Sequence, residues 1–226
     1  MKRPLTIWFP AFLFVCLLIA DLPFPNFLPN LTGGEQGLVE MAQTIFLLIA
    51  LFFATSCFLR LSPDNAVWIK VWFAAGALGC LYVLLEEISY GQHFFNWDTP
   101  EYWKRLNDQG ETNFHNTSSW LDQKPRLLLE IGIIVGGIII PVFDRIRSIS
   151  ISVLHKFRPV LPDTSLFLTA LLAILPRLYE RIIDVAGIDN GNLFVRTSEV
   201  QELYFYYFLL LYFLFIKGSV DDKKHA

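Results

Sequence analysis

Long apolar stretches separated by polar segments dominate the hydrophobicity pattern of this chain. Each stretch is about 20 residues long, the length that an α-helix needs to cross the ~30 Å hydrocarbon layer of a bilayer. The pattern therefore predicts an all-α fold: a polytopic transmembrane helical bundle of about six spans, forming a single membrane domain over residues 1–226. The predicted spans cover approximately residues 5–23, 38–59, 67–88, 127–143, 165–187 and 199–216.

The longest connection between these spans is the 91–125 loop. Within it, Thr99 followed by Pro100 predicts a helix N-cap with proline at the first helical position. Tyr102 and Trp103 come next, with basic residues directly after them. Aromatic rings with basic neighbours favour the headgroup depth of a membrane, so a short interfacial helix is expected in this loop.

The distribution of lysine and arginine predicts the orientation. With the N-terminus in the cytoplasm, the cytoplasmic segments hold eleven basic residues: Lys2, Arg3, Arg60, Lys70, Arg145, Arg147, Lys156, Arg158, Lys217, Lys223 and Lys224. The opposite segments hold five: Lys104, Arg105, Lys124, Arg126 and Arg196. Basic residues accumulate on the cytoplasmic side of membrane proteins, so both termini are expected there.

Composition agrees with a lipid environment and excludes some partners. Apolar residues make up 54% of the chain and charged residues 17%, against roughly 25% charged in soluble domains. A net charge of −3 provides no basic surface for nucleic acid. Cys16, Cys57 and Cys80 all lie in apolar runs, which supports neither a disulfide framework nor a cysteine metal site. The first apolar run has Leu18 where signal-peptide cleavage needs a small residue, so it is interpreted as a retained span.

Ionisable residues collect at the outward ends of the predicted spans. A charge within a span costs several kcal/mol unless it pairs, meets water or faces the bundle interior. We therefore expect these side chains to share one polar chamber at the outer leaflet. They are Glu40, Gln43, Glu86, Glu87, Glu130, Arg177, Glu180, Arg181, Asp184, Glu199 and Glu202.

The fifth span concentrates this polarity on one helical face. Arg177, Glu180, Arg181 and Asp184 are spaced at i, i+3, i+4 and i+7, and Pro176 just before them predicts a kink. The arginines are candidates for holding an anionic headgroup. The alternative is a network of ion pairs that locks the helices together.

The end of the third span and the following loop are dense in carboxylates, amides and imidazoles. Residues 86–92 read EEISYGQ, and residues 107–116 read NDQGETNFHN. These segments resemble a signature of uncharacterised bacterial inner-membrane proteins, E-E-I-S-aromatic-G-Q followed by N-x-Q-x-E-x-N-x-H-N. The resemblance implies a multi-pass inner-membrane protein and transfers no activity. That signature has arginine where this chain has His93, so His115 is the better candidate ligand or base.

An imidazole near several carboxylates allows two kinds of chemistry. The candidate catalytic residues are Glu86, Glu87, Glu111 and His115, as a general acid/base group. Glu87, Glu111 and His115 could instead bind a divalent metal, and a third interpretation is a hydrogen-bond network that orders the loop. The candidate substrate-binding residues are Gln92, Asn113, Asn116, Arg177, Arg181 and Glu202.

Two architectural features complete the pattern. Gly132 and Gly136 form a G-x-x-x-G motif, which predicts close approach of another helix. Tyr204, Tyr206 and Tyr207 are expected to anchor the sixth span at the interface or to line the chamber.

Two main function classes remain open. The first is a membrane enzyme with an outward-facing site for a lipid or lipid-linked substrate. The second is a non-enzymatic sensor or assembly subunit that presents the 91–125 loop to a protein partner. A transporter is less favoured, because the inner halves of the spans are nearly apolar.

Overall fold

The computed structural model describes residues 2–20, 37–63, 65–95, 97–106, 112–114, 119–147, 156–188, 193–194 and 196–222. The regular elements of these residues are all helical, which confirms the predicted all-α class. In chain order the elements are η1 (Pro4–Trp8), α1 (Phe9–Ala20), α2 (Leu38–Arg60), α3 (Val67–Glu87), η2 (Ser89–Gly91), α4 (Gln92–Phe95), α5 (Glu101–Lys104), α6 (Ser119–Ile133), η4 (Ile134–Ile139), α7 (Ile140–Arg147), η5 (Arg158–Val160), η6 (Thr164–Leu166), α9 (Phe167–Val185) and α10 (Thr197–Asp222).

Four helices within the described residues are long and apolar enough to cross a membrane: Leu38–Arg60, Val67–Glu87, Lys124–Arg145 and Thr197–Gly218. This finding supports a multi-pass membrane protein. The first helical segment, Pro4–Ala20, is apolar but shorter than these four. The α9 helix is not among them, since its second half carries the four charged residues of the predicted fifth span. The predicted number of six spans is thus not reached by length and hydropathy alone.

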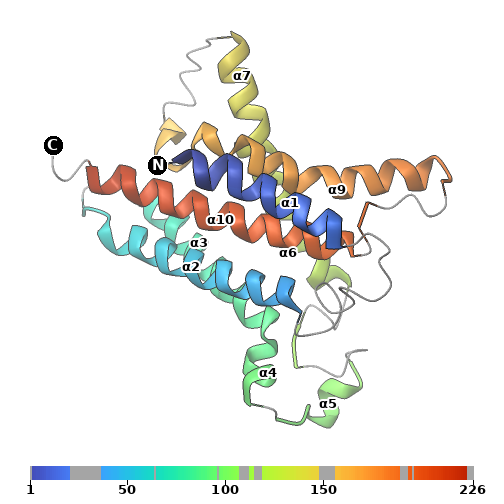
Figure 1. Cartoon of the computed structure of the whole chain (residues 1–226). Helices are drawn as coiled ribbons and strands as arrows, with labels where there is room; N and C mark the ends of the chain where they lie inside the picture. The colour runs from blue at the N-terminus through green and yellow to red at the C-terminus, as the bar shows by residue number, and fades with distance from the viewer. Residues whose placement is uncertain are drawn as a thin grey trace.

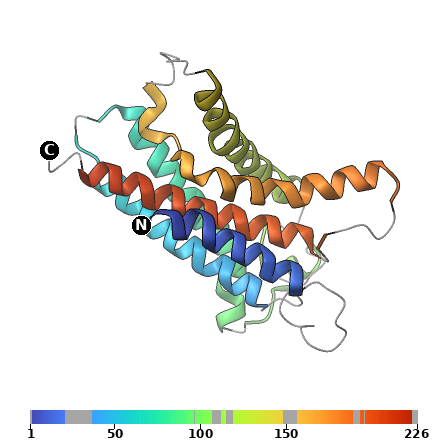
Figure 2. The ribbon, with the colours of Figure 1, turned by 45° about the horizontal axis from the view of Figure 1, so that its top comes forward.

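The last helix, α10, is the centre of the bundle. Of its apolar segment 78% is buried, against 22–28% for the other three helices that could cross a membrane. It packs against α2, α9 and α6, and α1 lies along it in both views (Figures 1 and 2). Because α10 is surrounded by other helices, its apolar side chains form the protein core. The outer faces of its neighbours are the surfaces left for lipid.

The α2 and α10 helices run parallel and in register. Glu40 pairs with Arg196 just before α10, and the side chain of Gln43 donates to the backbone oxygen of Glu199. Further along, the thiol of Cys57 lies 3.6 Å from the backbone oxygen of Phe213. The same sequence separation of 156 residues recurs in all three contacts. The two helices therefore point in one direction over their shared length.

The α1 helix runs the opposite way, so the two ends of the helical chain meet. The ammonium of Lys2 lies 4.9 Å from the ring centre of Phe215, near the end of α10, and pairs with Asp163 just before η6. We call this end of the bundle the terminal end. The opposite end contains the last residues of α3 and the first residues of α10, and we call it the site end. Figure 1 shows both chain ends on one side of the bundle.

A tyrosine of α10 satisfies a backbone oxygen that a proline leaves free in η1. The first turn of the chain is a π-helix in which the Phe9 N–H donates to the Pro4 oxygen, five residues back. In this register the oxygen of Leu5 would need the N–H of residue 10, which is Pro10 and has none. The hydroxyl of Tyr207 donates to that oxygen at 2.7 Å.

Two other tyrosines of α10 make similar links. Tyr204 donates to the Pro10 oxygen at 2.6 Å, and Tyr212 donates to the Val160 oxygen at 2.6 Å while accepting from the indole of Trp72. All of these tyrosines are buried. Tyr204 and Tyr207, which were expected to anchor the span at the interface or to line the chamber, thus make interior contacts that tie α10 to η1 and α1.

Small residues allow the α6–η4–α7 helix to cross α9 and α10 closely. A Cβ atom on Gly137 would lie 2.7 Å from the Cβ of Ala170 and 3.0 Å from the ring of Phe208. Gly136 is also buried, whereas Gly132 is exposed and faces open space. Close approach was expected at Gly132 and Gly136; the tightest helix contact is instead one residue further on, at Gly137.

Substitution of these glycines tests the crossing. Gly137→Ala should lower the free energy of unfolding by about 1–3 kcal/mol, because the new methyl group meets a Cβ fixed on the α9 backbone. Gly132→Ala has the same chemistry in open space, so its stability should stay unchanged or rise by up to ~1 kcal/mol through helix propensity. Thermal unfolding in detergent measures both. Equal stability of the two variants would contradict the close crossing.

Candidate functional site

The α3 helix ends in a strained turn. After Glu87 the chain passes through Ser89, Tyr90 and Gly91, with φ values of 45°, 55° and 93°. Glycine adopts positive φ readily, but each non-glycine residue there costs of order 1–3 kcal/mol and persists only where the surroundings fix it. The turn redirects the chain from α3 into α4 (Figure 1).

Buried hydrogen bonds fix this turn. Both oxygens of Glu86 accept a hydrogen bond, one from the Tyr90 hydroxyl at 2.7 Å and the other from the Phe114 backbone N–H at 2.8 Å. The amide of Asn113 donates to the hydroxyl of Ser89 at 3.1 Å. Glu86 is 4% exposed, and Ser89 and Asn113 are fully buried. The segment around residue 113 is thus held against the end of α3.

The environment of Tyr90 keeps its hydroxyl protonated. Burial raises the pKa of the Tyr90 phenol, and the hydrogen bond to Glu86 and the charge of that carboxylate raise it further. Since an ordinary tyrosine already titrates near pH 10, Tyr90 remains a hydrogen-bond donor at neutral pH. One oxygen of Glu86 is therefore held by a permanent donor.

Gln92 joins two parts of the following loop. Its side-chain nitrogen donates to the Thr99 hydroxyl at 2.7 Å, and its side-chain oxygen accepts from the Thr112 N–H at 2.8 Å. Thr99 was expected to cap the following helix. Instead Pro100 occupies the N-cap of α5, no side chain caps it, and the Thr99 hydroxyl bonds Gln92.

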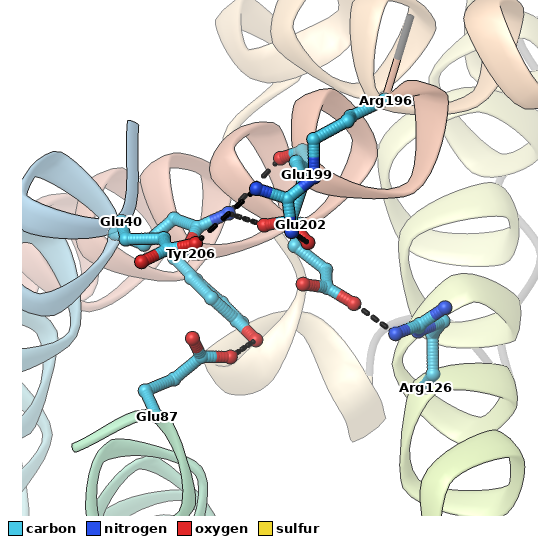
Figure 3. A network of polar contacts seen from close by, with 8 residues as sticks. Glu40, Glu87, Arg126, Arg196, Glu199, Glu202 and Tyr206 are labelled. Carbon is cyan, nitrogen blue, oxygen red and sulfur yellow. Dashed lines mark hydrogen bonds and ion pairs between the residues drawn. The ribbon is translucent and has the colours of Figure 1, made fainter. Parts of the chain in front are cut away.

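A second group of polar contacts lies between α3, α6 and α10 (Figure 3). The Tyr206 hydroxyl donates to Glu87 at 2.6 Å. One turn earlier on α10, Glu202 forms an ion pair with Arg126 of α6. The side chain of Glu202 is 11% exposed and that of Arg126 is 29% exposed, so the pair is largely shielded from solvent. Three helices are thus connected through α10.

Arg196 connects α2 with the start of α10. Its guanidinium lies 3.4 Å from Glu40 and 3.1 Å from Glu199 (Figure 3). Gln43, which is fully buried, donates to both the backbone and the carboxylate of Glu199. The carboxylates that enter the bundle here are neutralised by a cation from the connecting segment, which agrees with the cost of leaving a charge unpaired among helices.

The charged face of α9 pairs more loosely. Arg177 forms an ion pair with Glu180 on its own helix, and Arg181 lies 3.7 Å from Glu130 of α6 with 60% of its side chain exposed. Asp184 is exposed. The second half of α9 extends past the start of α10 in both views (Figures 1 and 2). This face is accordingly wetter than the contacts around Glu202.

The sequence-predicted candidates fall into three sets. The turn after α3 brings together Glu86, Gln92 and Asn113, while Glu87 contacts Tyr206 of α10, one turn after Glu202 on the same helix. The arginines of α9 pair with Glu180 and Glu130 instead. The remaining candidates lie outside the described residues: Glu111, His115 and Asn116.

The expected metal site remains a prediction, because Glu111 and His115 lie outside the described residues. Within the described part of the chain, no group of three or more histidine, cysteine, aspartate or glutamate side chains could hold a metal ion. Of the three candidate ligands, only Glu87 is among the described residues. Its described partner is a tyrosine hydroxyl.

Sequence reasoning missed two side chains of these contacts. Arg196 carried a local signal, because it precedes Glu199 by three residues and such pairs meet on one helical face. Arg126 carried none, since its partner Glu202 lies on another helix. Tyr206 was named as able to line the chamber, but its partner Glu87 could not be predicted.

Comparison with protein-family models, with curated proteins and with solved structures finds no match for this chain.

A double-mutant cycle tests the Arg126–Glu202 pair. Arg126→Met and Glu202→Gln should each lower the free energy of unfolding by about 1–3 kcal/mol, because each leaves a shielded partner without its opposite charge. The double variant should lose less than the sum of the two. Denaturation in detergent gives all values.

The exposed pair of Glu101 and Lys104, whose side chains are 78% and 48% exposed, is the matched control. Its coupling should stay below ~0.5 kcal/mol. Additive losses at Arg126 and Glu202 would show that their proximity contributes nothing.

Proposed function

We propose that the chain crosses the membrane six times. The helix directions support this number. Consecutive spans must alternate in direction, and α2 and α10 run parallel, so an odd number of crossings separates them. The α3 and α6–α7 helices provide two, and α9, which leads from the terminal end near Asp163 to the site end near Glu130, provides the third. By the same alternation α1, antiparallel to α10, is the first span.

The orientation follows from the basic residues. The terminal end carries Lys2, Arg60 and Lys217. With this end in the cytoplasm, the cytoplasmic segments of the chain hold more lysine and arginine than the opposite segments, which favours this orientation. Both termini are then cytoplasmic and the site faces outward. The resemblance in residues 86–116 adds a bacterial inner membrane to this proposal.

Reporter fusions test the topology. A reporter that is active only in the cytoplasm should be active after residue 64, after residue 155 and at both termini, and inactive after residues 110 and 190. With four crossings, the fusions after residues 155 and 190 would instead give the same activity, because α9 would not cross.

The site supports best an outward-facing membrane enzyme that acts on a lipid or lipid-linked substrate. One observation carries this proposal: Ser89 and Tyr90 adopt a costly backbone conformation that locking helices together does not require. Strain of this kind accumulates where side chains must be held for binding or catalysis. Here the strained turn accompanies different hydrogen-bond partners for two adjacent carboxylates. Glu86 accepts from the Tyr90 phenol and the Phe114 N–H, and Glu87 accepts from the Tyr206 hydroxyl.

Two neighbouring carboxylates with different partners suit general acid and base roles. Glu86 and Glu87 take these roles in the proposal, with His115 and Glu111 as further acid/base groups or as ligands of a divalent metal together with Glu87. Gln92, Asn113 and Asn116 orient the loop and the substrate.

In this proposal, Arg177 and Arg181 on the charged face of α9 bind the headgroup of the substrate. Arg177 and Arg181 are 36% and 60% exposed and present planar donors that match a phosphate or carboxylate. Glu202 shapes the inner wall of the site through Arg126.

The second candidate is a non-enzymatic sensor or assembly subunit. The pairing of Glu202 with Arg126 and of Glu40 with Arg196 favours it, because these contacts satisfy the cost of burial by themselves. In that case the polar network fixes the helices and the 91–125 loop meets a protein partner.

Lipid profiling distinguishes the two functions. Expression of the wild-type protein should change the abundance of one membrane lipid or lipid-linked class relative to an empty vector, as measured by mass spectrometry of extracted membranes. Glu87→Gln should abolish that change while keeping a monodisperse protein, because it removes an ionisable group and retains the size of the side chain.

Asp144→Asn, at an exposed position of α7, is the matched control and should retain the change. A lipid profile that is the same for wild type, Glu87→Gln and empty vector would contradict the enzyme and favour the second candidate.

A further inference from the structure

An arm of exposed aromatic side chains extends from the end of α3. It comprises residues 92–95 and 97–106, including α4 and α5, and projects away from the bundle helices (Figure 1). Phe95 is 77% exposed, Tyr102 71% and Trp97 41%. The rings of Phe95 and Trp97 stack with an interplanar angle of 9° and a centroid distance of 6.1 Å. Several large exposed aromatic side chains close together rarely face water without a partner.

The root of the arm lies at the end of a helix that is long and apolar enough to cross a membrane. Ile88 and the three residues of η2 separate this helix, α3, from α4, so the arm begins directly after a candidate span. Gly91 makes the turn possible, because it has a φ of 93° and a Cβ there would lie 3.2 Å from the Phe95 ring. The lipid-exposed surface of α3, which includes Leu78 and Leu81, leads to this turn. The arm is thus continuous with a surface that faces lipid.

The chemistry of the arm matches the headgroup layer of a bilayer. Tryptophan and tyrosine have an apolar body with a polar edge and accumulate at that depth. Charged residues of both signs accompany the rings, Asp98 and Glu101 with Lys104 and Arg105, and Glu101 lies 3.3 Å from Lys104. A balanced set of charges suits zwitterionic headgroups.

A chain of ring contacts connects the arm to the buried carboxylate of the site. Tyr102 meets Trp103 at 6.3 Å, Trp103 meets Phe114 at 5.0 Å, and Phe114 meets Tyr90 at 6.0 Å, all edge to face. The last two members of this chain hold Glu86: the Tyr90 hydroxyl donates to one oxygen and the Phe114 N–H to the other. Displacement of the arm would therefore move the two donors that hold Glu86.

We propose that the aromatic arm is seated in the headgroup layer of the outer leaflet and that this contact, passed through Trp103 and Phe114, holds the Glu86 carboxylate in its buried position. The site is then complete only at a lipid surface. This regulation rests on the proposed function in taking Glu86 as a reacting group; the seating of the arm does not.

Tryptophan quenching in nanodiscs tests the seating. The full chain is placed at one copy per disc in phosphatidylcholine that carries bromine either near the headgroup or deep in the acyl chain. The fluorescence of Trp97 is the difference between the emission of the wild type and that of Trp97→Phe. This difference should be quenched more strongly by the shallow bromines than by the deep ones. Trp103→Phe is the control on the same arm and gives the fluorescence of Trp103 in the same way. Because Trp103 is half-buried against Phe114, either brominated lipid should quench it less than Trp97.

An unquenched Trp97 component would overturn the seating. If that component became shielded only when two copies shared a disc, the occupant would be a second copy of this chain rather than lipid, and the proposal would fail in the same way.

Hydrogen exchange tests the coupling to the site. In nanodiscs, a Phe95→Asp, Trp97→Asp variant should exchange the Phe114 amide faster than wild type, because the arm leaves the interface and the hydrogen bond to Glu86 opens. Phe157→Asp, at a partly exposed ring of the terminal end, is the control and should leave that amide unchanged.

Equal exchange of the Phe114 amide in the arm variant and wild type would overturn the coupling. Neither readout depends on activity. Failure of the arm proposal is therefore distinguishable from failure of the proposed enzyme, which the lipid profile reports.

Discussion

A carboxylate inside a bilayer costs several kcal/mol unless a cation or water meets it, and α10 brings Glu199 and Glu202 into the bundle near its first residues. Each is met by an arginine from outside the helix: Arg196 from the preceding segment and Arg126 from α6. The apolar remainder of α10 can then be buried on all sides. Without these pairs, the most buried helix of the protein would carry uncompensated charge at its entrance.

The same pairing sets the register of the bundle. Arg196 also meets Glu40, so it fixes α2 beside α10 at the site end, and the Cys57 contact with the Phe213 backbone keeps the register at the other end. Because the two helices are thereby parallel, the proposal of six spans needs an odd number of crossings between them. On the charged half of α9, Arg177 pairs with Glu180 of the same helix and Arg181 lies near Glu130 of α6, so two of its charges have a carboxylate partner.

The lengths of the apolar stretches predicted the long helices well, for a physical reason. The bilayer demands about 20 apolar residues per crossing, and α2 and α3 begin at Leu38 and Val67 as expected. It could not predict partners, because the choice between helices depends on packing that no local pattern encodes. Arg177 and Arg181 of α9 were expected to hold an anionic headgroup or to lock the helices together, whereas Arg126, counted from the sequence only among the basic residues of the outward segments, is the one that pairs with Glu202.

Glycines show the same limit. A G-x-x-x-G motif indicates one face of a helix, and Gly132 lies on it, but the neighbouring helices cross further along, at Gly137. The tyrosines of α10 were similarly interpreted from depth alone. The hydroxyls of Tyr204 and Tyr207 instead donate to backbone oxygens, among them the one that Pro10 leaves free in η1, while that of Tyr206 donates to Glu87.

The turn at Ser89 and Tyr90 differs in its energetics from the ion pairs of the bundle. Ion pairs at Glu202 and Glu40 lower the energy of the folded bundle, so their presence needs no function. Two consecutive left-handed residues raise the energy of the folded state. The buried amide of Asn113 and the two donors to Glu86 stabilise this turn. A helix that only needed to end could do so with one glycine. The arrangement is explained if the position of Glu86 itself is what the fold maintains.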